Sequence, residues 1–246
     1  MGLEIQELTG GYAGQAVISD VNLKLAEGEV LGLIGLNGAG KSTTIKNILG
    51  LLRPQKGRIL LNGMQLVQQP AAFKKQVAYI PEMPILYPEL TLKEHLELTM
   101  LAYGLDPKAA WPRAKDLLEQ FRLSDKLDWL PIHFSKGMQQ KVMIVTAFLT
   151  DASLFVIDEP FTGLDPLAVS NLLELIRAAS RAGKMVLMTT HVLADAQQVV
   201  SRYAVLNRGH IETTGSLADI RDHYGLKPED SFDKLYQVLY QEQQNA

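Results

Sequence analysis

The chain of 246 residues is long enough for one large α/β domain or two small ones, and its 47% hydrophobic and 21% charged residues exclude a disordered protein. A net charge of −3 argues against a protein that binds nucleic acid electrostatically, and the lack of cysteine excludes disulfides and thiolate metal sites. The start shows no signal-peptide pattern, and the apolar stretches are too short to span a bilayer. We therefore expect an intracellular protein. If it works at a membrane, another chain must hold it there.

The first third of the chain favours β structure, followed by a strand, a loop and a helix. Residues 3–8 and 21–25 alternate apolar and polar positions, as half-buried strands do. The apolar run 30–35 predicts a buried strand, and residues 41–51 predict the helix after it. Further strands are expected at 58–63 and 77–80.

The middle of the chain favours helices alone. Thr91 and Glu94 have the spacing of a capping box, and Gly104 is expected to end the helix that they begin. Two more helices are expected at about 107–122 and 136–150, with no strand between 82 and 152. We therefore interpret residues 82–151 as a helical subdomain inserted into an α/β core formed by 1–81 and 152–225.

In the last third, strands and helices alternate again. Strands are expected at 154–158, 186–190 and 203–207, with helices at 166–182 and after Val192. This alternation indicates a largely parallel sheet. A final amphipathic helix is expected at about 229–245, with Phe232, Leu235 and Leu239 on one face.

One segment carries a strong phosphate-binding pattern. GLNGAGKST matches G-x-x-x-x-G-K-[ST] in full and lies between the predicted strand 30–35 and the following helix, which disfavours a chance glycine-rich turn. Backbone N–H groups of such a loop converge on phosphate oxygens, Lys41 reaches the β- and γ-phosphates, and Ser42 can bind Mg²⁺. The nucleotide-binding residues are therefore expected to be Gly35, Leu36, Asn37, Gly38, Ala39, Gly40, Lys41, Ser42 and Thr43.

Two adjacent carboxylates stand at the C-terminal end of the predicted strand 154–158: Asp158 ends the strand and Glu159 follows it. Asp158 is placed to hold Mg²⁺ through water, and Glu159 can polarise or deprotonate the water that attacks the γ-phosphate. The alternative, an exposed acidic turn, is disfavoured by the phosphate loop. His191 follows the strand 186–190 and is either a γ-phosphate contact or a structural histidine. The chain has no guanine-reading N-K-x-D, which argues against a GTPase.

With these motifs in this order, the chain resembles the nucleotide-binding subunits of ABC transporters over nearly its whole length. In SKGMQQK, IPEMPILYPELTL and DSFDKLY it is similar to the Ecs-type ATPases of Gram-positive bacteria. The resemblance implies an α/β P-loop NTPase of the ABC ATPase type, with a mostly parallel sheet, an antiparallel N-terminal β part and a helical subdomain. It also implies that Tyr12 stacks on adenine beside Val17, and that Asp165 couples two sites across a dimer. The alternatives are that Tyr12 packs on the sheet edge and that Asp165 is a helix N-cap, a role compatible with coupling.

Two positions depart from the family's pattern. Glu82 stands where the family usually has the glutamine that senses Mg²⁺ and the attacking water, and it adds negative charge beside the phosphates. Residues 134–138, FSKGM, replace the family's L-S-G-G-Q, and we call them the signature segment. Ser135 and Gly137 are retained and are expected to contact a γ-phosphate bound by another subunit, whereas Met138 lacks glutamine's contact to the ribose. Lys136 either adds a charge-assisted contact or points into solvent.

The resemblance further implies that ATP and Mg²⁺ bind between the phosphate loop of one copy and the signature segment of a second. Hydrolysis is then coupled to an integral membrane subunit on a separate chain, which places this protein at the cytoplasmic face of the membrane. The apolar segment Met83–Tyr87 either contacts a helix of that subunit or packs under the loop. Export of peptides or support of secretion is the expected direction. The alternatives are a soluble ABC ATPase acting on a ribosome or DNA, although no nucleic-acid partner is expected, and a nucleotide-regulated scaffold without turnover.

Overall fold

A six-stranded sheet forms the centre of the molecule. The computed structural model describes residues 2–190, 193–227, 230 and 232–244. The strands run in the order β10-β9-β3-β8-β7-β6, and β3 is parallel to both β8 and β9. Their bounds are β3 Val30–Ile34, β6 Val77–Ile80, β7 Leu154–Asp158, β8 Met185–Thr189, β9 Arg202–Asn207 and β10 His210–Gly215. The predicted parallel sheet is confirmed, but the sequence patterns did not indicate β10, which pairs antiparallel to β9.

A second, antiparallel sheet of four strands has the order β2-β1-β4-β5. It consists of β1 Gly2–Tyr12, β2 Gln15–Ala26, β4 Lys56–Leu61 and β5 Met64–Gln65. β1 and β2 are longer than predicted because their register shifts between Ile5 and Leu8 and again before Gly10. Such bulges break the alternation of apolar and polar residues, so a pattern-based assignment ends the strands early.

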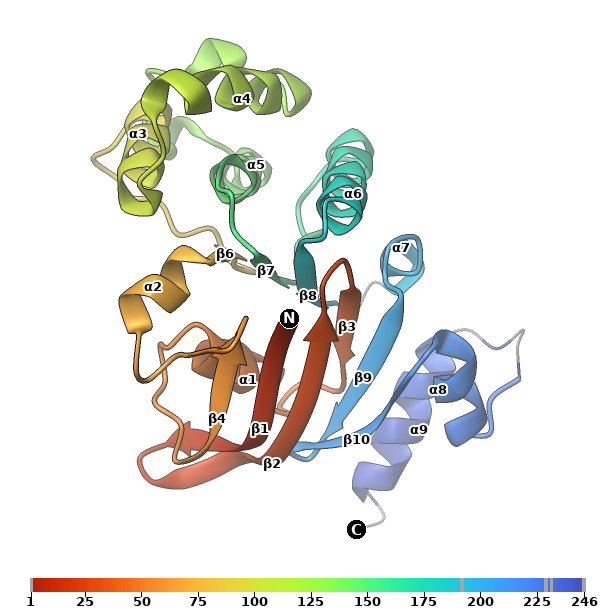
Figure 1. Cartoon of the computed structure of the whole chain (residues 1–246). Coiled ribbons are helices and arrows are strands. Elements are labelled where there is room, and N and C mark those ends of the chain that lie inside the picture. Colours follow the sequence, from red (N-terminus) through yellow and green to blue (C-terminus); the bar gives the residue numbers. More distant parts are fainter. Residues whose placement is uncertain (1, 191–192, 228–229, 231, 245–246) are drawn as a thin grey trace.

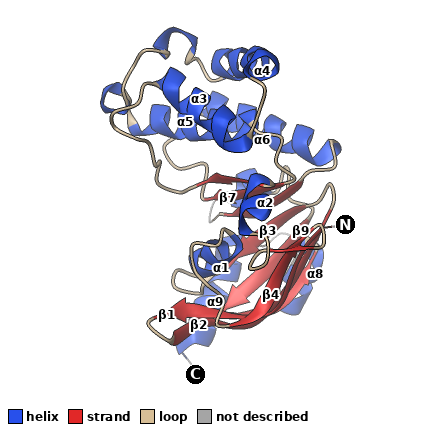
Figure 2. Cartoon of the chain, turned by 60° about the vertical axis from the view of Figure 1, so that its left-hand side comes forward, coloured by secondary structure: helices blue, strands red, loops and turns tan. Residues whose placement is uncertain are grey.

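Three helices lie between β6 and β7 in the chain and gather on the side of the six-stranded sheet that faces away from the four-stranded sheet (Figures 1 and 2). They are α3 Leu92–Tyr103, α4 Pro107–Gln120 and α5 Lys136–Leu149, with two short 3₁₀ turns at Ser124–Lys126 and Pro131–His133. The predicted capping box is confirmed, because Thr91 Oγ1 accepts from the Glu94 N–H at 3.2 Å and Glu94 Oε2 accepts from the Thr91 N–H at 2.7 Å. Gly104 ends α3 in the left-handed conformation, as expected.

In the part of the chain that the structure describes, buried apolar residues form three clusters. One joins α3, α4, α5 and α6, Pro166–Arg181, to the six-stranded sheet, and a second joins the two sheets to α1, Lys41–Ile48. The third packs α8, Leu217–His223, and α9, Phe232–Gln244, against β9 and the end of β3. The remaining helices are α2 Pro70–Lys75 and α7 Leu193–Ala196; neither α2 nor α8 was predicted. Among the described residues, no helix combines the length and apolar character that crossing a bilayer requires.

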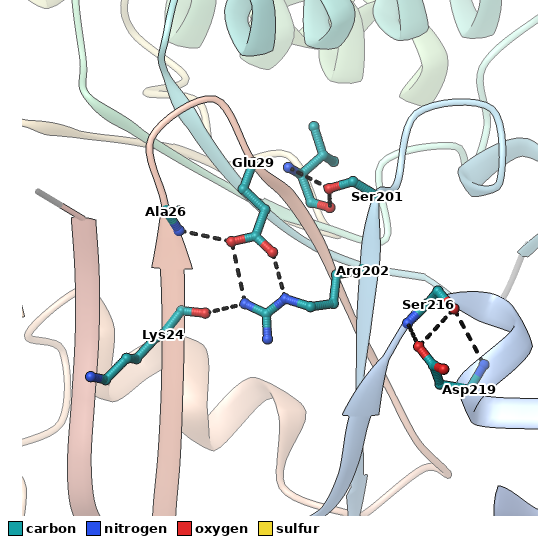
Figure 3. Close-up of polar contacts among 8 residues, drawn as sticks. Lys24, Ala26, Glu29, Ser201, Arg202, Ser216 and Asp219 are labelled. Atoms are coloured by element: carbon teal, nitrogen blue, oxygen red, sulfur yellow. Dashed lines mark hydrogen bonds and ion pairs between the residues drawn. The ribbon is translucent and has the colours of Figure 1, made fainter.

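Figure 3 shows how the turn between β2 and β3 is fixed to the start of β9. Arg202 forms a two-point ion pair with Glu29, with Nε–Oε1 at 2.5 Å and Nη2–Oε2 at 3.2 Å, and it also donates to the Lys24 carbonyl. Glu29 accepts from the Ala26 N–H at 2.8 Å. The two side chains are only 30% and 16% exposed, so solvent screens this pair weakly. The contacts fix β3, and hence the loop after it, against β9.

Candidate nucleotide-binding site

The loop between β3 and α1 has the backbone geometry of a phosphate site. Gly35 has φ 154°, and a Cβ there would lie 2.1 Å from the Leu206 carbonyl oxygen of β9, so no other residue fits. Gly40 begins α1 without a side-chain cap. Because uncapped N–H groups at a helix start attract anions, the first turn of α1 is suited to bind phosphate.

Lys41 places its ammonium group inside this loop. Its Nζ donates to the carbonyl oxygens of Gly35 at 2.7 Å and Leu36 at 3.2 Å. Burial lowers the pKa of Lys41, while the negative charges of Glu159, Asp158 and, to a smaller degree, Glu82 act in the opposite direction. Lys41 is therefore a half-buried cation in the field of a group of carboxylates.

Asp158 is the last residue of β7 and is buried, with 8% of its surface exposed. Thr189, opposite it on β8, donates its hydroxyl to Asp158 Oδ1 at 2.5 Å. Burial raises the pKa of the Asp158 carboxyl; the hydrogen bond from Thr189 opposes this effect, and the charges of Glu159 and Glu82 add to it. A buried carboxylate beside two like charges is a site where a cation is favourable.

Glu159 follows in an unusual backbone conformation. Its φ of 46° lies in the left-handed region, which costs a non-glycine residue about 1 kcal/mol. The Glu159 N–H donates to the Thr189 carbonyl at 3.1 Å, so the end of β8 holds both carboxylate residues. Strain retained at such a position indicates a functional constraint.

These groups converge on one pocket of about 630 Å³ at the carboxyl ends of β3 and β7. The lining brings together most of the predicted phosphate-site residues, with Ala39 buried behind it. The lining residues are Val17, Gly35, Leu36, Asn37, Gly38, Gly40, Lys41, Ser42, Thr43, Glu82, Asp158, Glu159 and Tyr236. Tyr236 was not predicted, because the pattern of the last helix indicates its apolar face but not which neighbour that face meets.

Tyr12, by contrast, lies outside this lining. It is 45% exposed at the end of β1, where Lys46 Nζ donates to its hydroxyl at 3.2 Å and lies 5.5 Å from its ring centre. That hydrogen bond is the main cause that lowers the pKa of Tyr12. Its stacking on adenine stays a prediction. The predicted contact from His191 falls outside the described residues.

The signature segment does not reach the pocket of its own chain. Ser135 is the N-cap of α5, and its Oγ accepts from the Met138 N–H at 3.2 Å. Lys136 is exposed, and Met138 is half-buried against the helical core. Asp165 is the N-cap of α6, accepting from the Ala168 N–H at 2.9 Å, so the N-cap role weighed for it holds.

The loop geometry, the half-buried lysine and the acidic pair at the end of β7 define a P-loop nucleoside triphosphatase. Residues 18–162 match the family model of ABC transporters. The chain is 48% identical to the ABC-type transporter ATP-binding protein EcsA of Bacillus subtilis, over 98% of this chain and 97% of that protein. It therefore belongs to the ABC transporter family and is one of its ATP-binding subunits.

Two further relatives agree with this assignment. The Nod factor export ATP-binding protein I of Rhizobium etli is 32% identical, over 89% of this chain and 70% of that protein. A solved structure of an ATP-binding subunit of an ABC transporter superposes with a TM-score of 0.92 at 48% identity, covering 98% of this chain and all of the other. The fold inferred from the sequence is confirmed.

Proposed function

We propose that the protein hydrolyses ATP as one half of a homodimer and thereby drives a separate membrane subunit. The observation that carries this proposal is the division of the site. Lys41, Asp158 and Glu159 converge on one pocket, while Ser135 and Gly137, among the described residues, do not line it. A second copy of the chain supplies the missing signature segment, and the ATP-bound state is therefore a dimer.

The residues of the pocket divide the work of phosphoryl transfer. Lys41 and the first turn of α1 hold the β- and γ-phosphates and stabilise the charge that develops on them. Glu159 accepts a proton from the attacking water, and its strained backbone fixes the direction of its carboxylate. Glu82 lines the same pocket and orients the same water as a hydrogen-bond acceptor.

The oxygen ligands in the pocket fit Mg²⁺. Ser42 and the buried Asp158 line the same pocket as Lys41 and would supply a hydroxyl and a carboxylate oxygen, and Glu82 would add a third oxygen ligand. No group of three or more His, Cys, Asp or Glu side chains in the described part of the chain could hold a metal ion on its own. A magnesium ion would therefore be shared with the nucleotide phosphates, whose charge it neutralises when bound.

The membrane subunit is expected to bind at the segment Met83–Tyr87, next to Glu82. Met83, Ile85 and Tyr87 are 59%, 71% and 60% exposed, whereas Leu86 is half-buried on the helical core. The Tyr87 N–H donates to His95 Nε2 of α3 at 2.9 Å, which holds the segment in place. An exposed apolar surface of this kind fits a helix of a partner and supports the proposal that the protein works at the cytoplasmic face of the membrane. The name of the Nod factor export relative supports export as the direction.

Three proteins test the proposal: wild type, Glu159→Gln and Lys41→Ala. We expect wild type to hydrolyse ATP and Glu159→Gln to bind ATP, dimerise with it and lose about 100-fold or more of the turnover. Lys41→Ala should lose ATP binding. The measurements are steady-state phosphate release and light scattering with and without ATP. Equal turnover in wild type and Glu159→Gln would favour a nucleotide-regulated scaffold over an ATPase. ATP binding without any formation of dimer would contradict the proposed homodimer.

A further inference from the structure

The last helix of the chain contributes a side chain to the nucleotide pocket. Leu235 and Leu239 are each 1% exposed and share a buried cluster with Ile34, the last residue before the phosphate loop, and with Val205 of β9. Figure 1 shows α9 next to α8, on the side of the molecule away from α3 and α4. Tyr236 follows Leu235 and is rotated by about 100° around the helix, so it emerges at the edge of the buried face. There it lines the pocket, as Leu36 does, and both side chains pack against the same buried cluster.

The hydroxyl of Tyr236 contacts the backbone at the end of β8. It donates to the carbonyl oxygen of Thr190 at 3.3 Å. Thr190 and the preceding Thr189 are 1% and 0% exposed, so this dipeptide is enclosed by protein. A long hydrogen bond of this kind contributes little to stability, but it selects one orientation of the peptide that it contacts.

The same dipeptide also holds the catalytic carboxylates. Thr189 donates its hydroxyl to Asp158 and accepts the N–H of Glu159 through its carbonyl. The end of β8 is therefore held from two sides, by α9 through Tyr236 and by the end of β7 through Asp158 and Glu159. The next residue along the chain is His191, for which the sequence predicts a contact to the γ-phosphate.

We propose that Tyr236 is a positioning residue that couples α9 to the nucleotide pocket, holding the end of β8 so that Asp158 and Glu159 keep their reactive arrangement. This inference rests on the proposed ATPase function and extends it to the C-terminal helix. It makes α9 responsive to the occupancy of the pocket, since a phosphate that orders Asp158 and Glu159 also orders their shared support on β8. A helix that only covered apolar surface would need Leu235 and Leu239, but not the tyrosine hydroxyl.

Tyr236→Phe tests this directly, because it keeps the ring against the buried cluster of α9 and removes only the hydroxyl. Tyr240→Phe is the matched control: it lies one turn further along α9, is 57% exposed and makes the same chemical change. We expect Tyr236→Phe to lower kcat about fivefold, the loss expected for one positioning hydrogen bond, while KM for ATP stays within about twofold. Its Tm should stay within about 1 °C of wild type. Tyr240→Phe should match wild type in kcat, KM and Tm.

A second readout separates this inference from the ATPase proposal. In the Glu159→Gln background, ATP should slow amide hydrogen exchange across residues 234–241 when Tyr236 is present, and much less with Tyr236→Phe. If wild type shows no ATP turnover but ATP still slows exchange in α9 when Tyr236 is present, the proposed function is refuted and the coupling of α9 to the pocket stands. An unchanged kcat in Tyr236→Phe, an equal loss in Tyr240→Phe, a loss explained by a lower Tm, or identical exchange with and without ATP would each overturn the inference.

Discussion

Lys141 on α5 and Asp165 at the start of α6 form an ion pair, with 2.6 Å between Nζ and Oδ2. Lys141 is 13% exposed and Asp165 51%, so the lysine is enclosed while the carboxylate reaches solvent. Gly137, one turn before Lys141, approaches the same loop, because a Cβ there would lie 2.4 Å from the Gly163 carbonyl oxygen. The signature segment and the loop before α6 are therefore fixed to each other, and we expect them to meet a second subunit as one surface.

Replacing Lys141 with methionine should remove the ion pair and keep most of the apolar stem. Because Asp165 is half exposed and keeps its bond from the Ala168 N–H, we expect the free energy of unfolding to fall by about 1 kcal/mol or less. The effect on ATP-dependent dimerisation and on kcat should be larger than this small effect on stability. Urea unfolding, light scattering and phosphate release measure the three effects. A fall of several kcal/mol in the free energy of unfolding, with normal dimerisation, would show that the ion pair serves the stability of the fold and not the dimer surface.

The pH dependence of that pair has a definite sign. The hydrogen bond from Lys141 is the main cause that lowers the pKa of Asp165. A carboxylate with a lowered folded-state pKa contributes stability above its unfolded pKa of about 4, and this contribution is lost as pH falls through the folded value. The stability difference between wild type and Lys141→Met should therefore narrow below about pH 4. A difference that stays constant down to strongly acidic pH would contradict the ion pair.

Gly137→Ala should force α5 away from the loop at Gly163. A Cβ within 2.4 Å of a backbone oxygen cannot be accommodated without movement, so we expect a loss of about 2 kcal/mol in stability and reduced turnover. Lys136→Ala, at an exposed neighbouring position, is the control and should change stability by about 0.5 kcal/mol at most. Thermal unfolding and steady-state ATP hydrolysis give the answer. Wild-type stability in Gly137→Ala would refute the close approach.

Asp158→Asn should stabilise the nucleotide-free protein while it abolishes turnover. Burial raises the pKa of Asp158, so the folded state prefers the protonated carboxyl and its ionisation costs stability as pH rises through the folded pKa. Asparagine is neutral and can still accept the hydroxyl of Thr189. We expect a gain of about 1 kcal/mol at neutral pH that shrinks toward about pH 4. A destabilised variant at neutral pH would show that Asp158 is structurally required as an anion.

Glu82→Gln should keep ATP binding. Glu82 is exposed, so solvent screens its charge, and the substitution removes one negative charge near the phosphates. We expect the Kd for ATP to change by about threefold or less, which corresponds to less than about 1 kcal/mol. Titration calorimetry with ATP and Mg²⁺ measures it, with Lys41→Ala as the reference for lost binding. An affinity as poor as that of Lys41→Ala would overturn the placement of Glu82 as a water-orienting residue.

Charged substitutions separate the surface of Met83–Tyr87 from its buried part. Ile85 is 71% exposed, so Ile85→Glu should leave stability and basal ATP hydrolysis near wild type and impair transport. Leu86 packs on the helical core, so Leu86→Glu should lower the stability itself, by about 2 kcal/mol or more. Co-purification of the membrane subunit, thermal unfolding and ATP hydrolysis distinguish the two. Equal loss of transport and basal hydrolysis in Ile85→Glu would contradict a docking role.

Most features set by residues close together in the sequence were predicted, whereas several contacts between distant parts of the chain were not. The strand at Val30–Ile34, the capping box at Thr91 and the N-cap at Asp165 follow from neighbouring residues, and local patterns predict them. β10 and α8 were missed, although Ser216 and Asp219 form a capping box before α8. Tyr236 was missed for another reason, since its place in the pocket depends on how α9 packs on Ile34, a contact between distant parts of the chain. The position of Tyr12 outside the pocket lining was likewise not predicted from its neighbours in the sequence.

The ion pair between Glu29 and Arg202 joins residues 173 positions apart, and β3, next to Glu29, lies between β8 and β9 in the sheet. On a translating ribosome, at about 5–20 residues per second, the apolar strand before the phosphate loop therefore waits roughly 10 to 30 s for its neighbours. During that time its edges are open to pairing with other chains. Nascent chains that stop before β9 should consequently bind no ATP and aggregate. Completion of the pocket is thus among the last steps in the biogenesis of this subunit.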